Sequence, residues 1–286
     1  MERIGIVGGS GLYELEGIKK IKEVAVTTPF GTPSDKLLLA RLEGREIVFL
    51  PRHGKTHSIN PSMINYRANM YAMKKMGVGW IISVTACGSL KEELKPLDFV
   101  IPDQFLDRTT QARKQTFFDD GIVAHIAFAQ PVCLCLAKEL YACAQQTGVG
   151  AHFGGTYVNM EGPQFSTLAE SNLYRSWGMD IIGMTNMTEA RLAREAQMCY
   201  ATLAAVTDYD CWHQSHESVT IEMIINNLKK NVSNSKTILK NVVTRIPQTR
   251  ECGCKNALKY AVITDLKTVS AAKRKKVDLL IKKDIK

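Results

Sequence analysis

Apolar and amphipathic segments alternate along most of the chain. Runs of β-branched, aromatic and other apolar residues predict strands, and segments with an apolar residue every three or four positions predict helices. The predicted strands are 3–9, 45–51, 80–88, 97–105, 154–165, 180–184 and 199–209. The predicted helices are 60–77, 130–148, 167–178, 188–198 and 219–243. This alternation is typical of an α/β protein with a mostly parallel or mixed sheet and helices on both faces.

Local signals support several of these elements. Asn60 can cap the helix at 60–77, Pro61 suits its first turn and Gly77 suits its end. Thr167 and Glu170 have the spacing of a capping box. The segment 246–254 carries no strong pattern and is expected to be a mobile connection.

Polar residues follow most of the predicted strands. In open α/β sheets, ligands bind beyond the carboxyl ends of the strands, so these residues are candidate ligand contacts. They are Gly8-Gly9-Ser10-Gly11, Arg52-His53, Thr85-Ala86, Phe165-Ser166, Met184-Thr185 and Asp208-Tyr209-Asp210.

Four of these strand ends favour an anion site. The GGSG turn after the first strand lacks the lysine of a P-loop and the second half of a dinucleotide-binding fingerprint. It can still present backbone N–H groups and the Ser10 hydroxyl to an anion. Arg52, Thr85 and Thr185 add a guanidinium and two hydroxyls. Without accompanying carboxylates, this set fits phosphate better than a metal.

Asp208 and Asp210 leave four interpretations open. In an extended segment the two side chains would share one face, and an apolar surround would raise a carboxyl pKa enough for proton donation. A metal site with His213 and His216, a covalent nucleophile and a simple Asp-rich turn are the alternatives. Proton donation is the favoured one.

The distribution of positive charge along the chain argues against nucleic-acid binding. The formal net charge is +9, but residues 271–286 hold seven Lys or Arg and two Asp and so contribute +5 of it. Val277, Leu280 and Ile281 recur at helical spacing, which predicts a solvated amphipathic helix in this basic tail. The sequence shows neither a long apolar span nor a signal peptide, and a cytoplasmic location is expected.

The eight cysteines favour buried or free thiols over disulfides. Cys87, Cys199 and Cys211 are expected to act as small buried hydrophobic residues. The spacings Cys133-Leu-Cys135 and Cys252-Gly-Cys254 are tighter than the usual zinc spacing. The second pair is predicted to be exposed, either as a redox-sensitive pair or as plain thiols.

Seven motifs resemble the trimeric nucleoside phosphorylases, from Ile4 to about Leu266. They are IGIVGGSGLYELEG, TPFGTPSD, PRHGKTHSINPSMINYRANMYAMK, SVTACGSL, DQFLDRTT, EGPQFST and MTNMTEARLAREAQMCYATLAAVTDYDCWH. The resemblance implies one α/β domain at 1–266 with a twisted mixed sheet flanked by helices, followed by a basic tail at 267–286. It also implies purine nucleoside phosphorolysis in a homotrimer or homohexamer, with phosphate as co-substrate and with no cofactor, metal, nucleic acid or membrane.

Site residues follow from the resemblance, position by position. Ser10, Arg52, His53, Thr85, Ala86 and Thr185 match phosphate contacts. Met184 matches a residue under the ribose, and Phe165 an aromatic at the base. His125 matches a histidine that reaches the nucleoside of a neighbouring subunit, and Ile221 and Ile224 line the 5′ pocket.

Two positions indicate which purine is used. Related enzymes for guanine and hypoxanthine carry a glutamate where Ser166 stands and an asparagine where Asp208 stands. Asp208 as proton donor to N7, with Asp210 as partner, therefore predicts a 6-amino purine. The apolar residues Ile221 and Ile224 of the implied 5′ pocket suit a 5′-methylthio group on the nucleoside. A broader purine or 5′-methylthioinosine phosphorylase is the alternative, and a nucleic-acid-binding protein is the rival of another class.

Overall fold

A long central strand, β5 (Val78–Ser89), organises the sheet of this protein. The computed structural model describes residues 2–110, 113–213 and 221–281. The other strands are β1 (Arg3–Gly8), β2 (Lys19–Val24), β3 (Leu37–Leu42), β4 (Arg45–Pro51), β6 (Phe99–Ile101), β7 (Gln104–Arg108), β8 (Ala151–Phe153), β9 (Thr156–Met160), β10 (Ile181–Gly183) and β11 (Cys199–Asp208).

Six α-helices and four 3₁₀ helices accompany these strands in the described part of the chain. The α-helices are α1 (Tyr66–Lys75), α2 (Leu134–Gln146), α3 (Leu168–Ser176), α4 (Asn186–Glu195), α5 (Ile221–Arg245) and α6 (Ala271–Ile281). The 3₁₀ helices are η1 (Ser10–Tyr13), η2 (Pro61–Met63), η3 (Gly253–Asn256) and η4 (Leu266–Thr268).

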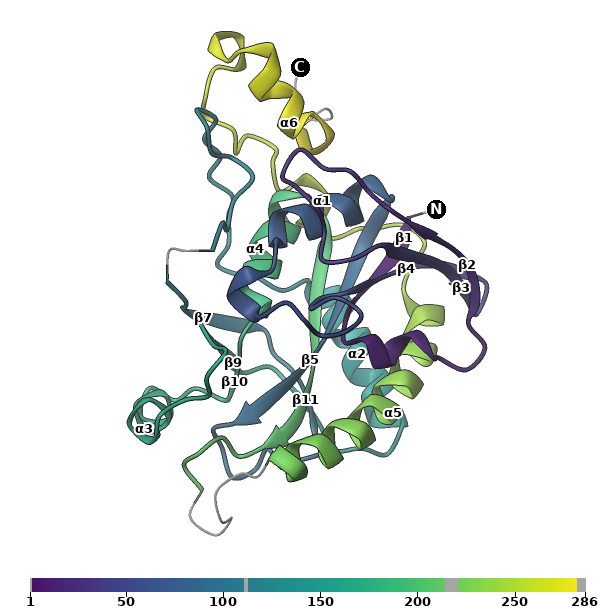
Figure 1. Cartoon of the computed structure of the whole chain (residues 1–286), viewed down its shortest axis with the longest axis vertical. Coiled ribbons are helices and arrows are strands. Elements are labelled where there is room, and N and C mark those ends of the chain that lie inside the picture. Colours follow the sequence, from purple (N-terminus) through teal and green to yellow (C-terminus); the bar gives the residue numbers. More distant parts are fainter. Residues whose placement is uncertain (1, 111–112, 214–220, 282–286) are drawn as a thin grey trace.

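The sheet forks along β5 (Figure 1). One edge of β5 pairs with β11 from Trp80 to Gly88. The opposite edge pairs in parallel with β1 as far as Ser83 and then antiparallel with β10 at Gly88 and Ser89. Neither strand pairs with β5 over residues 84–87, so this stretch of backbone is open. The mixed sheet predicted from the sequence is confirmed, and the fork is its main irregularity.

Helices cover both faces of the sheet. Alternate residues of a strand point to opposite faces, so Ile6 and Ile82 pack with α2 and α5 on one side. Val7 and Ile81 pack with α1, α4 and α6 on the other side. Both packed layers consist of aliphatic and aromatic side chains that are fully or almost fully buried. The prediction of helices on both faces is therefore confirmed.

The helix predicted over 60–77 is divided into two. Asn60 caps the 3₁₀ helix η2, with Pro61 in its first turn, and a second asparagine, Asn65, caps α1. The residues between them are not helical, because Ile64 is extended. Gly77 ends α1 in the left-handed region (φ +76°), as predicted. The sequence analysis also missed β2, β3 and β8.

Other local predictions are confirmed. The Thr167 and Glu170 side chains form both bonds of the capping box at α3, and Gly178 follows that helix with φ +77°. The long helix predicted over 219–243 is α5.

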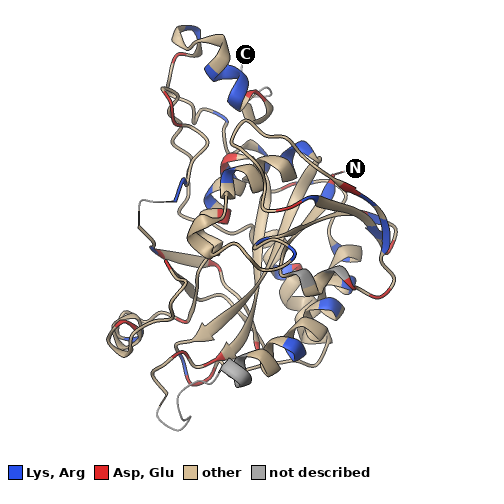
Figure 2. Cartoon of the chain, viewed as in Figure 1, with Lys and Arg blue, Asp and Glu red and all other residues tan. Residues whose placement is uncertain are grey.

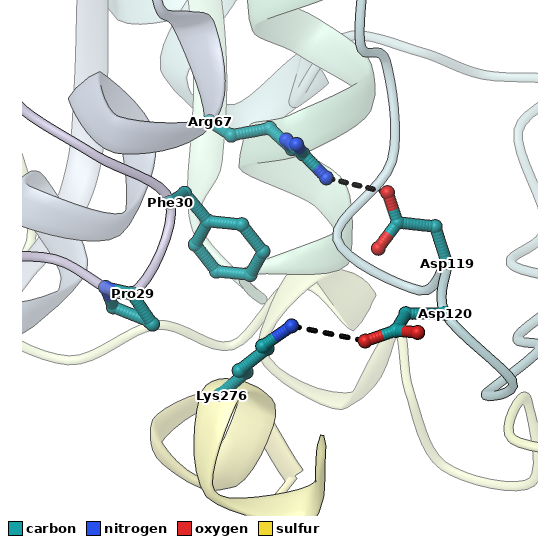
Figure 3. A pocket seen from close by; sticks show the side chains of 6 residues that line it. All are labelled: Pro29, Phe30, Arg67, Asp119, Asp120 and Lys276. Carbon is teal, nitrogen blue, oxygen red and sulfur yellow. Dashed lines mark hydrogen bonds and ion pairs between the residues drawn. The ribbon is translucent and has the colours of Figure 1, made fainter. Parts of the chain in front are cut away.

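The basic tail forms α6 and is part of the folded body. Val277, Leu280 and Ile281 are buried against the α1–α4 side of the sheet. Lys273 and Lys276 both form ion pairs with Asp120. Figure 3 shows one of these pairs beside the Arg67–Asp119 pair in a pocket of about 300 Å³. Two lysines of the tail are thus engaged within the chain.

Lys and Arg residues occur on several separate elements, including α6 and the lysine-rich β2 (Figure 2). No helix in the described ranges is long and apolar enough to cross a membrane.

Leu280→Ala is expected to lower the free energy of unfolding by about 2–5 kcal/mol, because it empties a buried site in the packed layer that contains α1, α4 and α6. Urea unfolding followed by circular dichroism measures this loss. Lys275→Ala, on the exposed side of the same helix, is the matched control and should change stability by less than about 0.5 kcal/mol. Equal stability of the two variants would show that α6 is not packed as described.

Candidate active site

Arg52 is placed beside the first glycine-rich turn by the pairing of β4 and β1. Pro51 is in register with Gly8, and the Arg52 N–H donates to the Gly8 carbonyl over 3.0 Å. A Cβ on Gly8 would lie 2.7 Å from Leu12 Cδ1, so glycine is required for this close approach. Ser10 begins η1 directly after this turn, but its side chain lies outside the described residues.

The Arg52 guanidinium is buried and paired with Glu189 of α4. Arg52 Nε donates to Glu189 Oε1 over 2.5 Å, and Nη2 donates to Ser83 Oγ over 2.6 Å. Nη1 donates to the Val84 carbonyl over 3.1 Å. Although burial opposes the charge, Glu189 raises the pKa of Arg52 further above its ordinary value. Arg52 is therefore a fixed cation, and its second Nη1 hydrogen has no acceptor among the described residues.

Three polar side chains complete this buried network. Tyr200 on β11 and Ser83 on β5 both donate to Glu189 Oε2, over 2.9 and 2.8 Å. Asn186, at the start of α4, donates to Ser83 Oγ over 3.0 Å. The sequence analysis missed all of these residues. The available signal was Glu189 itself, a charged residue on the otherwise apolar face of a predicted helix.

The open stretch of β5 supplies further anion donors. Thr85 and Ala86 were predicted at the end of a strand, and they lie inside β5, at the part of its edge that neither β1 nor β10 covers. Thr85 is partly exposed and Ala86 is exposed. Thr185 is buried at the N-cap of α4, where the helix dipole favours an anion. Its side-chain hydroxyl caps no backbone N–H of that helix.

His53 is held as a neutral ring. Its Nδ1 lies 2.7 Å from the Ile59 carbonyl, which fixes the proton on Nδ1 and leaves Nε2 as an acceptor. Burial and the neighbouring Arg52 charge lower the pKa of His53 to about 4. The ring also stacks on His57, with centroids 4.4 Å apart.

Met184 lies between β10 and α4 and packs against Gly162. A Cβ on Gly162, which has φ +67°, would lie 2.5 Å from Met184 Sδ. The Met184 carbonyl accepts hydrogen bonds from Arg113 Nη1 and from Asn159 Nδ2. Arg113 is itself buried and paired with Glu161. This second buried cation, which the sequence analysis missed, fixes the backbone of Met184.

Asp208 ends β11 next to Gly88 of β5. Its Oδ1 would be 3.1 Å from a Cβ on Gly88, so the glycine makes room for the carboxyl group. Oδ2 accepts from the Thr207 hydroxyl over 2.6 Å, and Oδ1 from the Asp210 N–H over 2.8 Å. Burial raises the pKa of Asp208 despite these two donors. The direction of this pKa shift is the one that proton donation requires.

The backbone at Asp210 is not extended as predicted. Asp210 has φ +53° and the chain turns there. Both aspartates nevertheless approach Gly88, since a Cβ on this glycine would lie 3.1 Å from Asp208 Oδ1 and 3.4 Å from Asp210 Cβ. The Asp208 side chain caps this turn through the Asp210 N–H. Burial also raises the pKa of Asp210. The turn leads to Cys211, whose thiol donates to the Ser166 carbonyl over 3.4 Å and which is exposed, contrary to prediction.

Helix α5 holds the end of β11 in place. Asn227 Nδ2 donates to the Thr207 carbonyl and the buried Asn231 Nδ2 donates to the Val206 carbonyl, both over 2.8 Å. The sequence analysis missed these two asparagines, which recur one helical turn apart.

The remaining predicted site residues lie at the periphery. Phe165 is exposed, Ser166 is buried, and His125 is exposed with its backbone N–H bound to the Ala261 carbonyl. The side chains of Ile221 and Ile224, in the first turn of α5, lie outside the described residues. The predicted 5′ pocket therefore has no described lining from these two residues.

The metal alternative for the aspartates gains no support from the described residues. His213 Nε2 lies 3.1 Å from Glu92, and His216 lies outside the described residues. Within the described ranges, one group of His, Cys, Asp or Glu has metal-binding geometry, and it consists of four cysteines and contains neither aspartate.

The two halves of the site are joined by β5. At about 3.3 Å per residue, Thr85 and Gly88 lie roughly 10 Å apart along the strand. Anion donors therefore occupy one end of the fork, and the Asp208 carboxyl occupies the other. This class of site suits an anion bound at one end and a basic heterocycle bound at the other.

The chain belongs to the phosphorylase superfamily, whose family model matches residues 3–244. Within it, the S-methyl-5′-thioadenosine phosphorylase of Geobacter sulfurreducens is 55% identical over 278 residues, covering 97% of both chains. A methylthioadenosine phosphorylase from an antarctic soil metagenomic library has a TM-score of 0.93 at 46% identity, with 98% of both chains covered. The Schistosoma mansoni enzyme in complex with adenine has a TM-score of 0.85 at 37% identity, covering 91% of this chain and 97% of that one.

Glu189→Gln is expected to lower the free energy of unfolding by about 3–5 kcal/mol, because it leaves the Arg52 charge buried without its counter-ion. Denaturant unfolding measures the difference. Glu93→Gln, at an exposed position, is the control and should be close to neutral. A loss below about 1 kcal/mol for Glu189→Gln would contradict the role given to this pair.

His53 is expected to stay neutral in the phosphate-free protein until the pH falls to about 4. Because the unfolded residue binds its proton near pH 6.5, this group lowers stability as the pH falls from about 6.5 to about 4. Carbon-13 NMR of labelled histidines measures the titration, and His53→Asn assigns the resonance. A midpoint near 6.5 would overturn the buried neutral ring.

Proposed function

We propose that the chain catalyses phosphorolysis of S-methyl-5′-thioadenosine to adenine and 5-methylthioribose 1-phosphate. The observation that carries the proposal is the placement of the Asp208 carboxyl, with its raised pKa, three residues along β5 from a set of anion donors. The names of the full-length relatives support the same substrate.

Phosphate is proposed to bind at the open edge of β5. Its contacts are the remaining Arg52 Nη1 hydrogen, the Thr85 and Thr185 hydroxyls, the Ala86 region and the Ser10 turn. His53 Nε2 can accept a proton from a protonated phosphate oxygen, or donate one if phosphate raises the ring's pKa. An anion fixed beneath C1′ stabilises the oxocarbenium-like transition state and then attacks it.

Asp208 is proposed to protonate N7 of the departing purine. The Thr207 hydroxyl has an acceptor in both protonation states of the carboxyl. It lies 2.6 Å from Asp208 Oδ2 and 3.2 Å from the Cys87 carbonyl. It donates to Asp208 when the carboxyl is ionised, and it can donate to the Cys87 carbonyl when the carboxyl is protonated, which leaves the acid proton free to be donated to N7. General acid catalysis of this kind contributes about 10²–10⁴-fold.

The same carboxyl favours a 6-amino purine. A protonated carboxyl can donate to N7 while its other oxygen accepts from the N6 amino group. Asp210 N–H holds the ionised form in this orientation through Oδ1. A 6-oxo purine presents an acceptor where adenine presents N6–H, which would face the carboxyl oxygen unfavourably.

Oligomerisation and pathway are further parts of the proposal. The exposed positions of His125 and Phe165 are consistent with a site completed by a neighbouring subunit in a homotrimer or homohexamer. The products would enter purine and methionine salvage in the cytoplasm. No metal or organic cofactor is required by the chemistry above, since phosphate supplies the nucleophile.

A phosphate-dependent assay with methylthioadenosine, adenosine and inosine tests the substrate. Methylthioadenosine should react fastest, adenosine more slowly and inosine least. Asp208→Asn should lower kcat for the two adenine nucleosides by about 10²-fold, because asparagine cannot donate a carboxyl proton.

Asp278→Asn on α6 is the control and should leave kcat unchanged. Faster turnover of inosine than of methylthioadenosine by the unaltered protein would overturn the 6-amino assignment. A kcat for Asp208→Asn within a few-fold of that of the unaltered protein would overturn the proton role.

A further inference from the structure

Four cysteine sulfurs gather at one place, on the α2–α5 face of the sheet. The Sγ atoms of Cys133, Cys199, Cys252 and Cys254 all lie within 4.8 Å of one another. Three of the residues are buried and Cys252 is partly exposed. The expectation that Cys252 and Cys254 form an exposed pair is therefore wrong.

The cluster joins three separate parts of the chain. Cys133 is the N-cap residue of α2, and Cys199 is the first residue of β11. Cys252 and Cys254 lie at the start of η3, in the connection that follows α5. The sequence spacing argued against zinc because each closely spaced cysteine pair was considered by itself. Here the pair at 252–254 is completed by two cysteines more than 50 residues away along the chain.

The sulfur spacing fits a single ion better than thiol pairs. Zinc–sulfur bonds of about 2.3 Å in a tetrahedron place the sulfurs roughly 3.8 Å apart. Cys133 and Cys252 are 3.8 Å apart and Cys199 and Cys252 are 3.2 Å apart. A disulfide needs about 2.05 Å. All six separations are at most 4.8 Å, which is no more than about 1 Å above the tetrahedral value.

The surroundings suit a centre that carries net negative charge. Four thiolates around a divalent ion leave a charge of −2. Cys133 lies at the positive end of the α2 dipole, and Arg250 is held close by, with its charge interacting with Cys199.

We propose that Cys133, Cys199, Cys252 and Cys254 bind one tetrahedral divalent metal ion with a preference for thiolates, with zinc as the natural occupant. Four protein ligands leave no open position, so the site is structural rather than catalytic.

The ion would fasten the connection after α5 to the body. Arg45 Nη1 donates to the Ile246 carbonyl over 2.6 Å, and Arg250 pairs with Glu2 and with the Gln197 carbonyl. These contacts anchor the segment that the sequence analysis expected to be mobile. The metal adds a third anchor at Cys252 and Cys254, from which the chain continues to α6.

Elemental analysis of the full chain, purified without chelator, tests the proposal. About one zinc ion per chain is expected, with a shell of sulfur only at about 2.3 Å in X-ray absorption. Replacement by Co²⁺ should give the visible bands of tetrahedral cobalt thiolate. Hydrogen exchange should show weaker protection of residues 246–256 after the metal is removed.

Cys252→Ser is the main variant, because Cys252 is the least buried of the four and its loss should leave the fold intact by circular dichroism. Zinc content should fall several-fold. Cys135→Ser, an exposed cysteine two residues from Cys133, is the matched control and should retain the metal.

Four outcomes separate the alternatives. Zinc in the unaltered protein that is lost in Cys252→Ser supports the site. Metal retained in that variant places it elsewhere and overturns the proposal. Protein that is purified without metal and takes up no added Zn²⁺ also overturns the proposal. Differential alkylation then distinguishes the last two outcomes, which are four free thiols or disulfides among these cysteines. Each outcome is independent of the phosphorolysis assay, so failure here would leave the proposed function untouched.

Discussion

The site depends on one buried ion pair, Arg52 with Glu189. Two charges taken out of water are stable only when nearly every donor and acceptor is satisfied, and this requirement fixes the surrounding elements. Arg52 comes from the end of β4, Ser83 from β5, Tyr200 from β11 and Glu189 from α4. A shift of any of these elements would leave a buried polar group unpaired. The network around this pair therefore sets the positions of Thr85, two residues from Ser83, and of Thr185, one helical turn from Glu189.

The fork in β5 turns this fixed network into a binding site. Where β1 has ended and β10 has not begun, the strand keeps backbone and side-chain groups that no neighbouring strand uses. An unpaired strand edge normally promotes pairing with another chain. Here the unpaired stretch is only four residues long and lies inside a sheet that is covered by helices. Gly88, at the end of the gap, admits the Asp208 carboxyl. The distance between the anion donors and the proton donor is thus fixed by the regular spacing of residues along β5 and not by the conformation of a loop.

The sequence predicted which strand ends meet, but not which hydrogen-bond and ion-pair partners their side chains have. Arg52, Thr185 and Asp208 could be collected because carboxyl ends of strands gather at one edge. Glu189 could not, because nothing in a helical pattern shows which distant cation a buried carboxylate pairs with. The extended backbone expected at Asp210 is wrong, because a positive φ there ends the strand with a turn that the apolar pattern does not reveal. The cysteine cluster was not predicted because its members come from three segments that are far apart in the sequence. Rules based on local spacing cannot detect ligands that the fold brings together.

Strand β11 has a cysteine of the proposed metal site at one end and the proposed proton donor at the other. The length of the strand sets the distance between them. Cys199 begins the strand and Asp208 ends it, so they lie roughly 30 Å apart at about 3.3 Å per residue. Between them β11 is paired with β5 over almost its whole length, and its far end is held by Asn227 and Asn231 of α5. Because the Asp208 end has its own anchors, an ion at the Cys199 end is not needed to position the proton donor. It acts instead on the connection after α5, which has far fewer backbone pairs of its own. The proposed metal site and the proposed chemistry therefore share a strand while depending on different interactions.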